Sequence, residues 1–229
     1  MNSTGTSEAV EALIPSAQDP ECLAGRWMNL ESSVIPGAVA AVCYVGASGH
    51  VYRSGCDCLR EYDSSTFPMP DSEPIFLPPH RAQLPSVKGQ LLGIDPIFTA
   101  QQITRALRDG MYYECRRDIQ RILGGEISEN TVLRCVGGHT KNRYEMQLKS
   151  DALGCVIETV RKEDIASKGA FILASVSCGW NASIPETAEQ LYAKMEKERY
   201  IPDPERKKRY DEIYREHYFP QFPEGLNSI

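Results

Sequence analysis

The stretch Thr131 to Gly154, TVLRCVGGHTKNRYEMQLKSDALG, contains the pattern that decides the fold class. A short β-prone run meets the glycine pair Gly137-Gly138, and an amphipathic segment follows from Thr140 to Leu153. Apolar residues at helical spacing after a glycine turn predict a strand, a turn and a helix in that order. The glycines would also let the backbone approach a ligand closely, although such a pair is equally typical of ordinary turns.

The residues after this stretch repeat the same order. Cys155 to Val160 is an apolar run, and Ile165 to Leu173 carries small residues on a face suited to packing on a sheet. Strand, helix, strand, helix predicts an α/β fold. Helical patterns resume at Glu186 to Glu198 and Pro204 to Tyr218, and the stretch Phe219 to Pro223 is expected to lie extended.

A long helix is predicted upstream of this unit. Thr99 and Gln102 form a capping box, and apolar residues then recur at helical spacing until a glycine pair stops them. Farther upstream, Ala38 to Gly46 and Gly49 to Ser54 are expected to form a hairpin. The proline-rich stretch Asp63 to Leu84 is expected to be a surface connection.

The composition describes an ordinary globular chain. It has 229 residues, of which 41% are hydrophobic and 24% charged, and its formal net charge is −6. The apolar stretches are too short to span a bilayer and the N-terminus has no leader pattern, so we expect a single domain in the cytoplasm without membrane contact. The acidic balance, with no dense basic stripe, argues against nucleic acid as a partner.

The cysteines predict buried thiols rather than a disulfide framework, because most lie in hydrophobic surroundings. These are Cys43, Cys115, Cys135, Cys155 and Cys178. The close pair Cys56 and Cys58 has no second pair downstream, as a structural zinc site would need, so no metal site is expected. Neither a Walker-type loop nor a serine-hydrolase elbow occurs.

Several ordered segments are similar to the motifs of a known family. They are Gly5-Thr6-Ser7-Glu8, Phe76-Leu77-Pro78 with Lys88-Gly89, Gln102 to Gly110, Cys135 to Asn142, and Ala166 to Ala170 with Gly179-Trp180. Together they resemble the C-terminal half of the FGGY carbohydrate kinases, which are ATP-dependent sugar and polyol kinases. The resemblance covers about Ser3 to Tyr218. It implies an α/β domain of the actin-like ATPase (ribonuclease H-like) fold, with a mixed sheet flanked by helices.

The resemblance also implies a nucleotide site that uses ATP and Mg²⁺. By position, Thr6 would lie near the phosphates, while Gly137, Gly138 and Asn142 would line the adenosine site. Gly55 would begin another nucleotide-side segment. The resemblance therefore implies that the partner of this chain is an adenine nucleotide.

The sequence departs from the family pattern in places that bear on activity. Leu59 and Arg60 stand where the family has Gln and Trp, and Arg108 stands where an apolar residue is usual. FGGY kinases are longer than this chain, and their first half supplies the aspartate that acts as base and most sugar contacts. The resemblance thus implies that this chain contains no catalytic residue of its own.

We therefore expect the ATP-binding C-terminal half of a carbohydrate kinase that phosphorylates a sugar or polyol hydroxyl with MgATP and is inactive alone. A separately encoded N-terminal half, or self-association, would cover an exposed apolar face, either around Gly169 and Ala170 or along Val34 to Val42. The alternatives are a non-catalytic nucleotide-binding or interaction module and a remnant without function.

Overall fold

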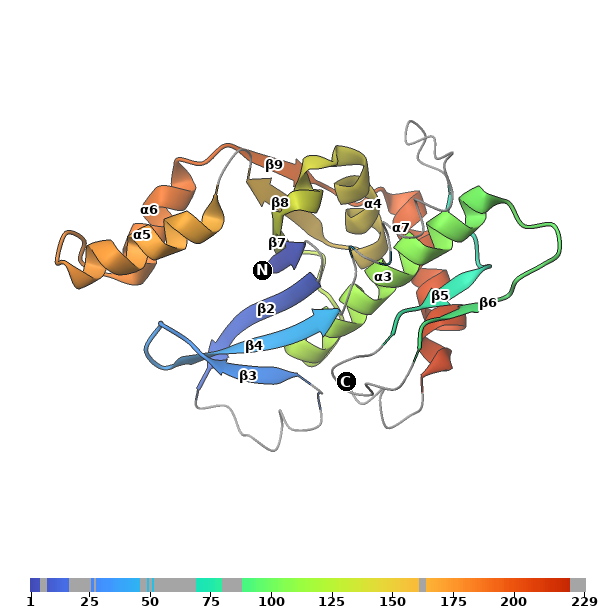
Figure 1. Cartoon of the computed structure of the whole chain (residues 1–229), viewed down its shortest axis with the longest axis horizontal. Helices are drawn as coiled ribbons and strands as arrows, with labels where there is room; N and C mark the ends of the chain where they lie inside the picture. The colour runs from blue at the N-terminus through green and yellow to red at the C-terminus, as the bar shows by residue number, and fades with distance from the viewer. Residues whose placement is uncertain are drawn as a thin grey trace.

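The computed structural model describes residues 1–4, 8–16, 26, 28–45, 49, 51, 69–79, 88–160 and 164–222 (Figure 1). The strands are β1 (Asn2–Thr4), β2 (Glu8–Pro15), β3 (Asn29–Ser32), β4 (Ala38–Val45), β5 (Ile75–Leu77), β6 (Gln90–Leu92), β7 (Val132–Gly137), β8 (Val156–Val160) and β9 (Lys197–Tyr200). The helices are α3 (Ala100–Leu123), α4 (Arg143–Leu153), α5 (Ile165–Ser177), α6 (Ile184–Ala193) and α7 (Pro204–Ile213). Short turns of 3₁₀-helix, η1 (Gly138–Lys141) and η3 (Phe219–Gln221), and of π-helix, η2 (Tyr214–Tyr218), complete the described elements.

A seven-stranded mixed sheet in the order β3-β4-β2-β1-β7-β8-β9 forms the centre of the molecule, and β5 pairs with β6 separately. β1 runs parallel to β7, and β7 runs parallel to β8, while the other neighbours are antiparallel. The predicted α/β class is therefore confirmed. The carboxyl ends of the three parallel strands lie along one edge of the sheet, where open α/β sheets bind their ligands.

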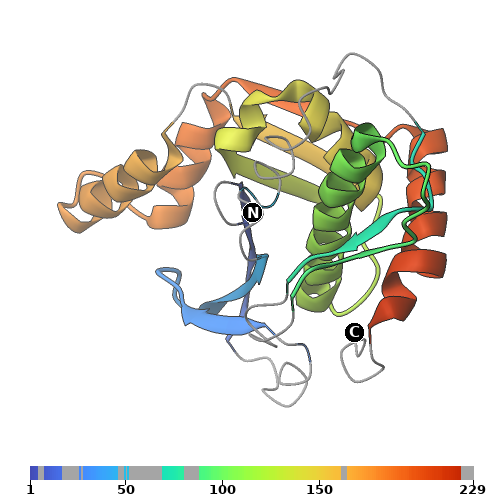
Figure 2. The ribbon, with the colours of Figure 1, turned by 45° about the vertical axis from the view of Figure 1, so that its right-hand side comes forward.

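Helix α3 lies between the sheet and the C-terminal helices, as Figures 1 and 2 show. One side of it packs with the sheet, through Cys115, Ile119 and Ile122. The other side packs against α7 and η2, through Tyr112 and Tyr113. The core thus has two apolar layers, one on each side of α3 and α4.

The ends of α3 follow the predicted signals. The Thr99 hydroxyl accepts from the Gln102 N–H at 3.2 Å, and the Gln102 carboxamide oxygen accepts from the Thr99 N–H at 3.0 Å. The helix ends at Gly124, whose φ of 70° lies in the left-handed region that glycine adopts without strain. Among the described helices, none is long and apolar enough to cross a bilayer.

Burial on both sides of α3 also buries its charged residues, which pair with each other. Arg117 donates to Glu114 at 2.6 Å, and Arg121 donates to Asp118 at 2.8 Å. Tyr218 adds a hydrogen bond to Glu114 at 2.9 Å. These contacts offset part of the cost of removing the charges from water.

Helices α5 and α6 form a hairpin that projects from the β8–β9 side of the body (Figures 1 and 2). The small-residue face of α5 was predicted to pack on the sheet, and this prediction is wrong. Helix α5 contacts α6, and Ser175 is its one buried residue. Cys178, predicted to be buried, is exposed at the end of α5 for the same reason, while Cys43, Cys115, Cys135 and Cys155 are buried as predicted.

Three local predictions are also corrected. The helix predicted through Glu198 ends at Ala193, because Lys197–Tyr200 pairs with β8 as strand β9. Part of the predicted surface connection is strand β5, with Ile75 and Phe76 in the core. The Phe219–Gln221 segment is a 3₁₀ turn rather than extended, since Pro220 fits the first turn of a helix.

The predicted hairpin between residues 38–46 and 49–54 is only partly within the described residues. Its first arm is strand β4, which pairs with β2 and β3 instead. Gly49 and Val51, the described residues of the second arm, are helical, so the second strand was predicted wrongly. The first arm pairs with strands that lie elsewhere in the sequence, and residue spacing within one segment does not report such pairing.

Candidate functional site

Gly137 and Gly138 form the turn that connects β7 to η1 and α4, as the sequence predicted. Gly137 has a φ of 108°, and a Cβ there would lie 2.1 Å from the Thr4 carbonyl oxygen. The fold itself therefore requires glycine at position 137. Apart from its neighbours in the chain, no described residue has an atom within 4 Å of a Cβ placed on Gly138, so the described structure gives no steric reason for glycine there.

Strand β1 brings a second predicted segment to the same edge. Thr4, its last residue, pairs with Gly137, and the Thr4 hydroxyl donates to the Val136 carbonyl oxygen at 3.0 Å. The chain continues from Thr4 into residues 5–7, so Thr6 follows directly after this contact in the sequence. Thr6 and Gly55, both predicted to bind nucleotide, lie outside the described residues.

Asn142 is the N-cap of α4. Its carboxamide oxygen accepts from the backbone N–H groups of Tyr144 at 3.1 Å and Glu145 at 3.3 Å. A ligand would therefore meet the NH₂ group of this side chain, which is a donor. The predicted binding residue thus also has a structural role at the start of the helix.

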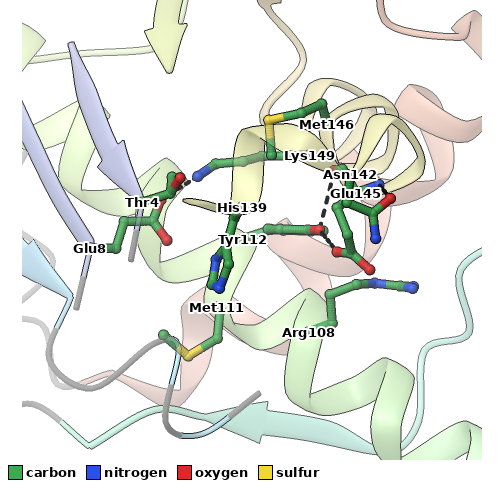
Figure 3. A pocket seen from close by; sticks show the side chains of 10 residues that line it. All are labelled: Thr4, Glu8, Arg108, Met111, Tyr112, His139, Asn142, Glu145, Met146 and Lys149. Carbon is green, nitrogen blue, oxygen red and sulfur yellow. Dashed lines mark hydrogen bonds and ion pairs between the residues drawn. The ribbon is translucent and has the colours of Figure 1, made fainter. Parts of the chain in front are cut away.

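A small cavity of about 100 Å³ lies on one side of this turn, between β1, α3 and α4 (Figure 3). From α4 it is lined by Asn142, Glu145, Met146 and Lys149, which share one helix face at spacings of three, four and seven residues. The other lining residues are Thr4, Glu8, Arg108, Met111, Tyr112 and His139. The apolar parts of this lining suit a flat ring, and the buried polar groups would fix its orientation.

The polar groups of this cavity are paired across its walls. Tyr112 donates to the Glu145 carboxylate and, at 3.2 Å, to the Glu145 carbonyl oxygen. Burial and the nearby Glu145 carboxylate raise the pKa of Tyr112 well above its usual value, so its hydroxyl keeps its proton. Arg108 donates to Asp109 at 3.1 Å and lies 6.0 Å from the centre of the Tyr144 ring.

The floor of the cavity contains a buried lysine. Lys149 is 1% exposed, and its ammonium donates to Asn2 at 2.7 Å and forms an ion pair with Glu8. Burial alone would lower the pKa of Lys149, but Cys115 and Glu8 raise it above its usual value, so the group is charged. Figure 3 shows the lysine side chain reaching from α4 towards the β1–β2 strands.

A larger hollow of about 680 Å³ lies at the carboxyl ends of β7 and β8. Gly137, Gly138 and Thr140 line it from the turn, and Asp164 and Ile165 line it from the start of α5. Asp164 caps α5 by accepting from the Ser167 hydroxyl at 2.7 Å and the Ser167 N–H at 3.2 Å, and these bonds lower its pKa. The hollow is large enough for a small-molecule ligand.

The structure places Gly137 and Gly138 on the larger hollow and Asn142 on the small cavity, and it adds lining residues that the sequence analysis missed. That all three line one adenosine site stays a prediction. Lys149 could have been found by its spacing from Asn142, whereas its partner Glu8 lies far away in the sequence. Within the described ranges, no group of His, Cys, Asp or Glu side chains could hold a metal ion.

Comparison with known proteins gives a consistent result. Residues 1–178 match the family model described as "FGGY family of carbohydrate kinases, C-terminal domain". A xylulose kinase of Staphylococcus epidermidis is 29% identical over 130 residues, which cover 56% of this chain and 25% of that protein. A glycerol kinase of Trichlorobacter lovleyi is 29% identical over 174 residues, covering 69% of this chain and 35% of that protein.

Solved structures share the fold. The ligand-bound xylulose kinase from Lactobacillus acidophilus superposes with a TM-score of 0.80 at 18% identity, covering 96% of this chain and 46% of that one. The chain has the actin-like ATPase fold of these kinases. It spans less than half the length of the kinases it matches.

Proposed function

Because the chain belongs to the FGGY family of carbohydrate kinases, we propose that it is the nucleotide-binding half of such a kinase, folded as a single domain. The complete enzyme would transfer the γ-phosphoryl group of MgATP to a sugar or polyol hydroxyl. The observation that carries this proposal is the Gly137–Asn142 turn, whose residues line two hollows and which contains a glycine, Gly138, for which the described structure gives no steric reason.

The proposed nucleotide lies across this turn. The adenine base of the nucleotide would enter the small cavity, where Met111 and Met146 offer apolar contact and the Asn142 NH₂ group offers a hydrogen-bond donor. The ribose and phosphates of the nucleotide would pass over Gly138, where they could approach the backbone closely, towards Thr6. The resemblance assigns Gly55 to a further nucleotide-side segment, and Mg²⁺ would arrive bound to the phosphates.

Phosphoryl transfer needs positioning and charge neutralisation, together with a base that takes the proton of the attacking hydroxyl. In the proposal, this chain holds and orients the nucleotide. The general base that takes this proton, and most contacts to the sugar substrate, belong to the part of the kinase that this chain does not span. We therefore expect the chain to be inactive alone. The chain then needs a partner surface that closes over the nucleotide.

The α5–α6 hairpin is the proposed docking surface for that partner. Phe171 is 49% exposed and Leu173 is 41% exposed on α5, and Trp180, between the two helices, is 76% exposed. The first turn of α5 also lines the larger hollow, through Ile165. A partner seated on the hairpin would therefore lie beside the nucleotide, which fits the missing half of a kinase.

Calorimetric titration with MgADP tests the proposed site. The wild-type chain is expected to bind, and Gly138→Val is expected to weaken binding at least tenfold, because its side chain fills the space over the turn. Gly125→Val is the matched control, since a Cβ at Gly125 also meets nothing within 4 Å but lies at the end of α3. Equal affinity in all three proteins would contradict the proposed site.

The non-catalytic module stays as the alternative outcome. Co-expression with a cognate N-terminal kinase half is expected to give sugar-dependent release of ADP. Nucleotide binding with no turnover, in a complex shown by light scattering to have formed, would favour the module instead.

A further inference from the structure

The wall of the small cavity contains a buried carboxylate next to Asn142, the proposed base-binding residue. Glu145 follows Asn142 by three residues, so the two side chains are neighbours on one face of α4, and both line the cavity (Figure 3). Glu145 is 9% exposed. The cavity therefore offers a ligand a carboxylate acceptor close to the NH₂ donor of Asn142.

Tyr112 of α3 fixes the position of this carboxylate. Its hydroxyl donates to Oε2 of Glu145 and, at 3.2 Å, to the Glu145 carbonyl oxygen. Tyr112 is itself 7% exposed, and it lines the same cavity. The acceptor is thus held between α3 and α4 before any ligand binds, which is the arrangement that gives a polar group in a pocket its selectivity.

The apolar lining of the cavity leaves the polar groups to read the edge of a ring. Met111 of α3 and Met146 of α4 are 4% and 2% exposed and supply apolar contact for a flat ring. Substituents on the edge of that ring would then meet Glu145 and Asn142.

The pattern of donor and acceptor on α4 matches one edge of adenine. A carboxylate only accepts hydrogen bonds, and the NH₂ group of Asn142 only donates them. Adenine has a donor, its 6-amino group, beside the ring nitrogen N7, which accepts. One acceptor and one donor on neighbouring positions of the helix therefore complement this edge.

The same pattern suits guanine less well. Guanine has two acceptors, N7 and O6, on the corresponding edge, so its O6 would lie against the Glu145 carboxylate. Its opposite edge has two neighbouring donors, which need both oxygens of a carboxylate. Tyr112 already donates to Oε2 of Glu145, so the carboxylate is better suited to a single amino group.

We propose that Glu145 is a specificity-determining residue that accepts a hydrogen bond from the 6-amino group of the base and so selects adenine nucleotides. This rests on the proposed function, because that function places the base of the nucleotide in the small cavity. A carboxylate has about four acceptor sites, so Glu145 can accept from the base while it accepts from Tyr112.

The test combines one change in the protein with one change in the ligand. Glu145→Met removes the carboxylate and keeps a good helix former, and Tyr112 retains the carbonyl oxygen of residue 145 as an acceptor. The second ligand is purine riboside 5′-diphosphate with Mg²⁺, which differs from MgADP only by lacking the 6-amino group. Circular dichroism and urea unfolding establish that the variant is folded.

Calorimetric titration gives the affinity of each protein for each ligand. The wild type is expected to bind MgADP at least about tenfold more tightly than the ligand without the amino group, because a buried acceptor would lose its donor. Glu145→Met is expected to bind the two ligands within about twofold of each other. Loss of the negative charge affects both diphosphates alike, so it cancels in the ratio.

Asp151→Asn is the matched control. Asp151 is the other carboxylate of α4, and it pairs with Arg206 of α7 at 2.6 Å instead of lining the cavity. This variant is expected to keep the wild-type ratio. If Glu145→Met does not fold, Glu145→Gln replaces it and is expected to lower the ratio at least about threefold, since a neutral acceptor forms the weaker bond.

Three results would overturn the proposal while leaving nucleotide binding in place. They are a wild type that binds both ligands equally, a folded Glu145 variant that keeps the wild-type ratio, and a wild type that binds MgGDP as tightly as MgADP. A wild type that binds none of these diphosphates at millimolar concentration would instead contradict the proposed function, and the proposal for Glu145 would fail with it.

Discussion

Helices α3 and α5 show opposite relations between polarity and burial. In α3, Arg117 and Arg121 are each 1% exposed, because carboxylates one turn away pair with them. In α5, apolar Phe171 and Leu173 are exposed. Among the described elements, this helix packs mainly against α6. Charged residues can thus be buried where oppositely charged partners exist, and apolar residues can stay exposed where none of the described elements covers them.

Truncation of one aliphatic side chain in each region is expected to give the largest difference in stability between the two regions. Ile213 is 0% exposed and packs in the same cluster as residues of α3 and α4. Ile213→Ala is expected to lower the unfolding free energy of the protein by about 2–5 kcal/mol. Leu173→Ala in α5 is expected to lose less than about 1 kcal/mol. Urea unfolding of the two variants measures both values. Similar losses would mean that the hairpin is part of the cooperative core.

The buried charges of α3 should make the unfolding free energy depend on pH. Burial and the neighbouring Glu114 raise the pKa of Asp118 from 3.8 to about 7. The folded chain then binds a proton that the unfolded chain has lost, so the unfolding free energy falls as the pH rises from about 4 to about 7, by at most about 1.4 kcal/mol per pH unit.

Asp118→Asn removes this titration and is expected to flatten the pH dependence of the unfolding free energy between pH 5 and pH 7. Urea unfolding at several pH values checks it. Leu173→Ala serves as the control, because it leaves the charged cluster intact. Parallel pH curves for the wild type and Asp118→Asn would contradict the expected titration.

One tyrosine hydroxyl in each region is also expected to affect unfolding in a different way. Tyr192 of α6 donates to Glu158 of β8, with Arg134 at 4.2 Å and Lys197 at 4.5 Å from its ring. Tyr192→Phe removes this hydrogen bond between α6 and β8, and it is expected to lower the free energy of local opening of the hairpin by about 1 kcal/mol. The effect should be seen as faster amide exchange in the hairpin, without a change in global unfolding.

The matched change in the body is Tyr214→Phe, which removes a hydroxyl that donates to Gln120 at 2.6 Å. Here the loss of about 1 kcal/mol should be seen in global unfolding by urea. A global loss for Tyr192→Phe as well would show that the hairpin and the body unfold together.

Charge on the exposed face of α5 should have the smallest effect on stability. Phe171→Glu is expected to change unfolding by less than about 0.5 kcal/mol and to reduce self-association of the isolated chain. Size-exclusion chromatography with light scattering compares it with the wild type at high concentration. A wild-type chain that stays monomeric would mean that α5 offers no face for association.

The sequence was sufficient for features that depend on neighbouring residues. The Thr99–Gln102 capping box, the Gly124 stop and the turn at Gly137-Gly138 all follow from short-range chemistry. The α/β class follows from the order of these elements. The resemblance to the FGGY kinases identified the fold, which the comparisons confirm.

Features that depend on distant residues could not be predicted. The predicted helical pattern ran through Glu198, yet Arg199 pairs with Glu158 and residues 197–200 form a strand. The Lys149–Glu8 pair likewise joins residues at opposite ends of the chain. In α5 the apolar residues Phe171 and Leu173 are exposed. Small residues at helical spacing predict packing but do not show which surface they would meet.

We propose that nucleotide binds at the turn between β7 and α4 and not at the α5–α6 hairpin. Amide chemical shifts of the labelled chain during a MgADP titration test this proposal. We expect the largest shifts on Gly138, Asn142 and Glu145 and at the Thr4 and Glu8 ends of β1 and β2, with α7 unaffected. No shifts at millimolar MgADP, or the largest shifts in α6 or α7, would contradict it.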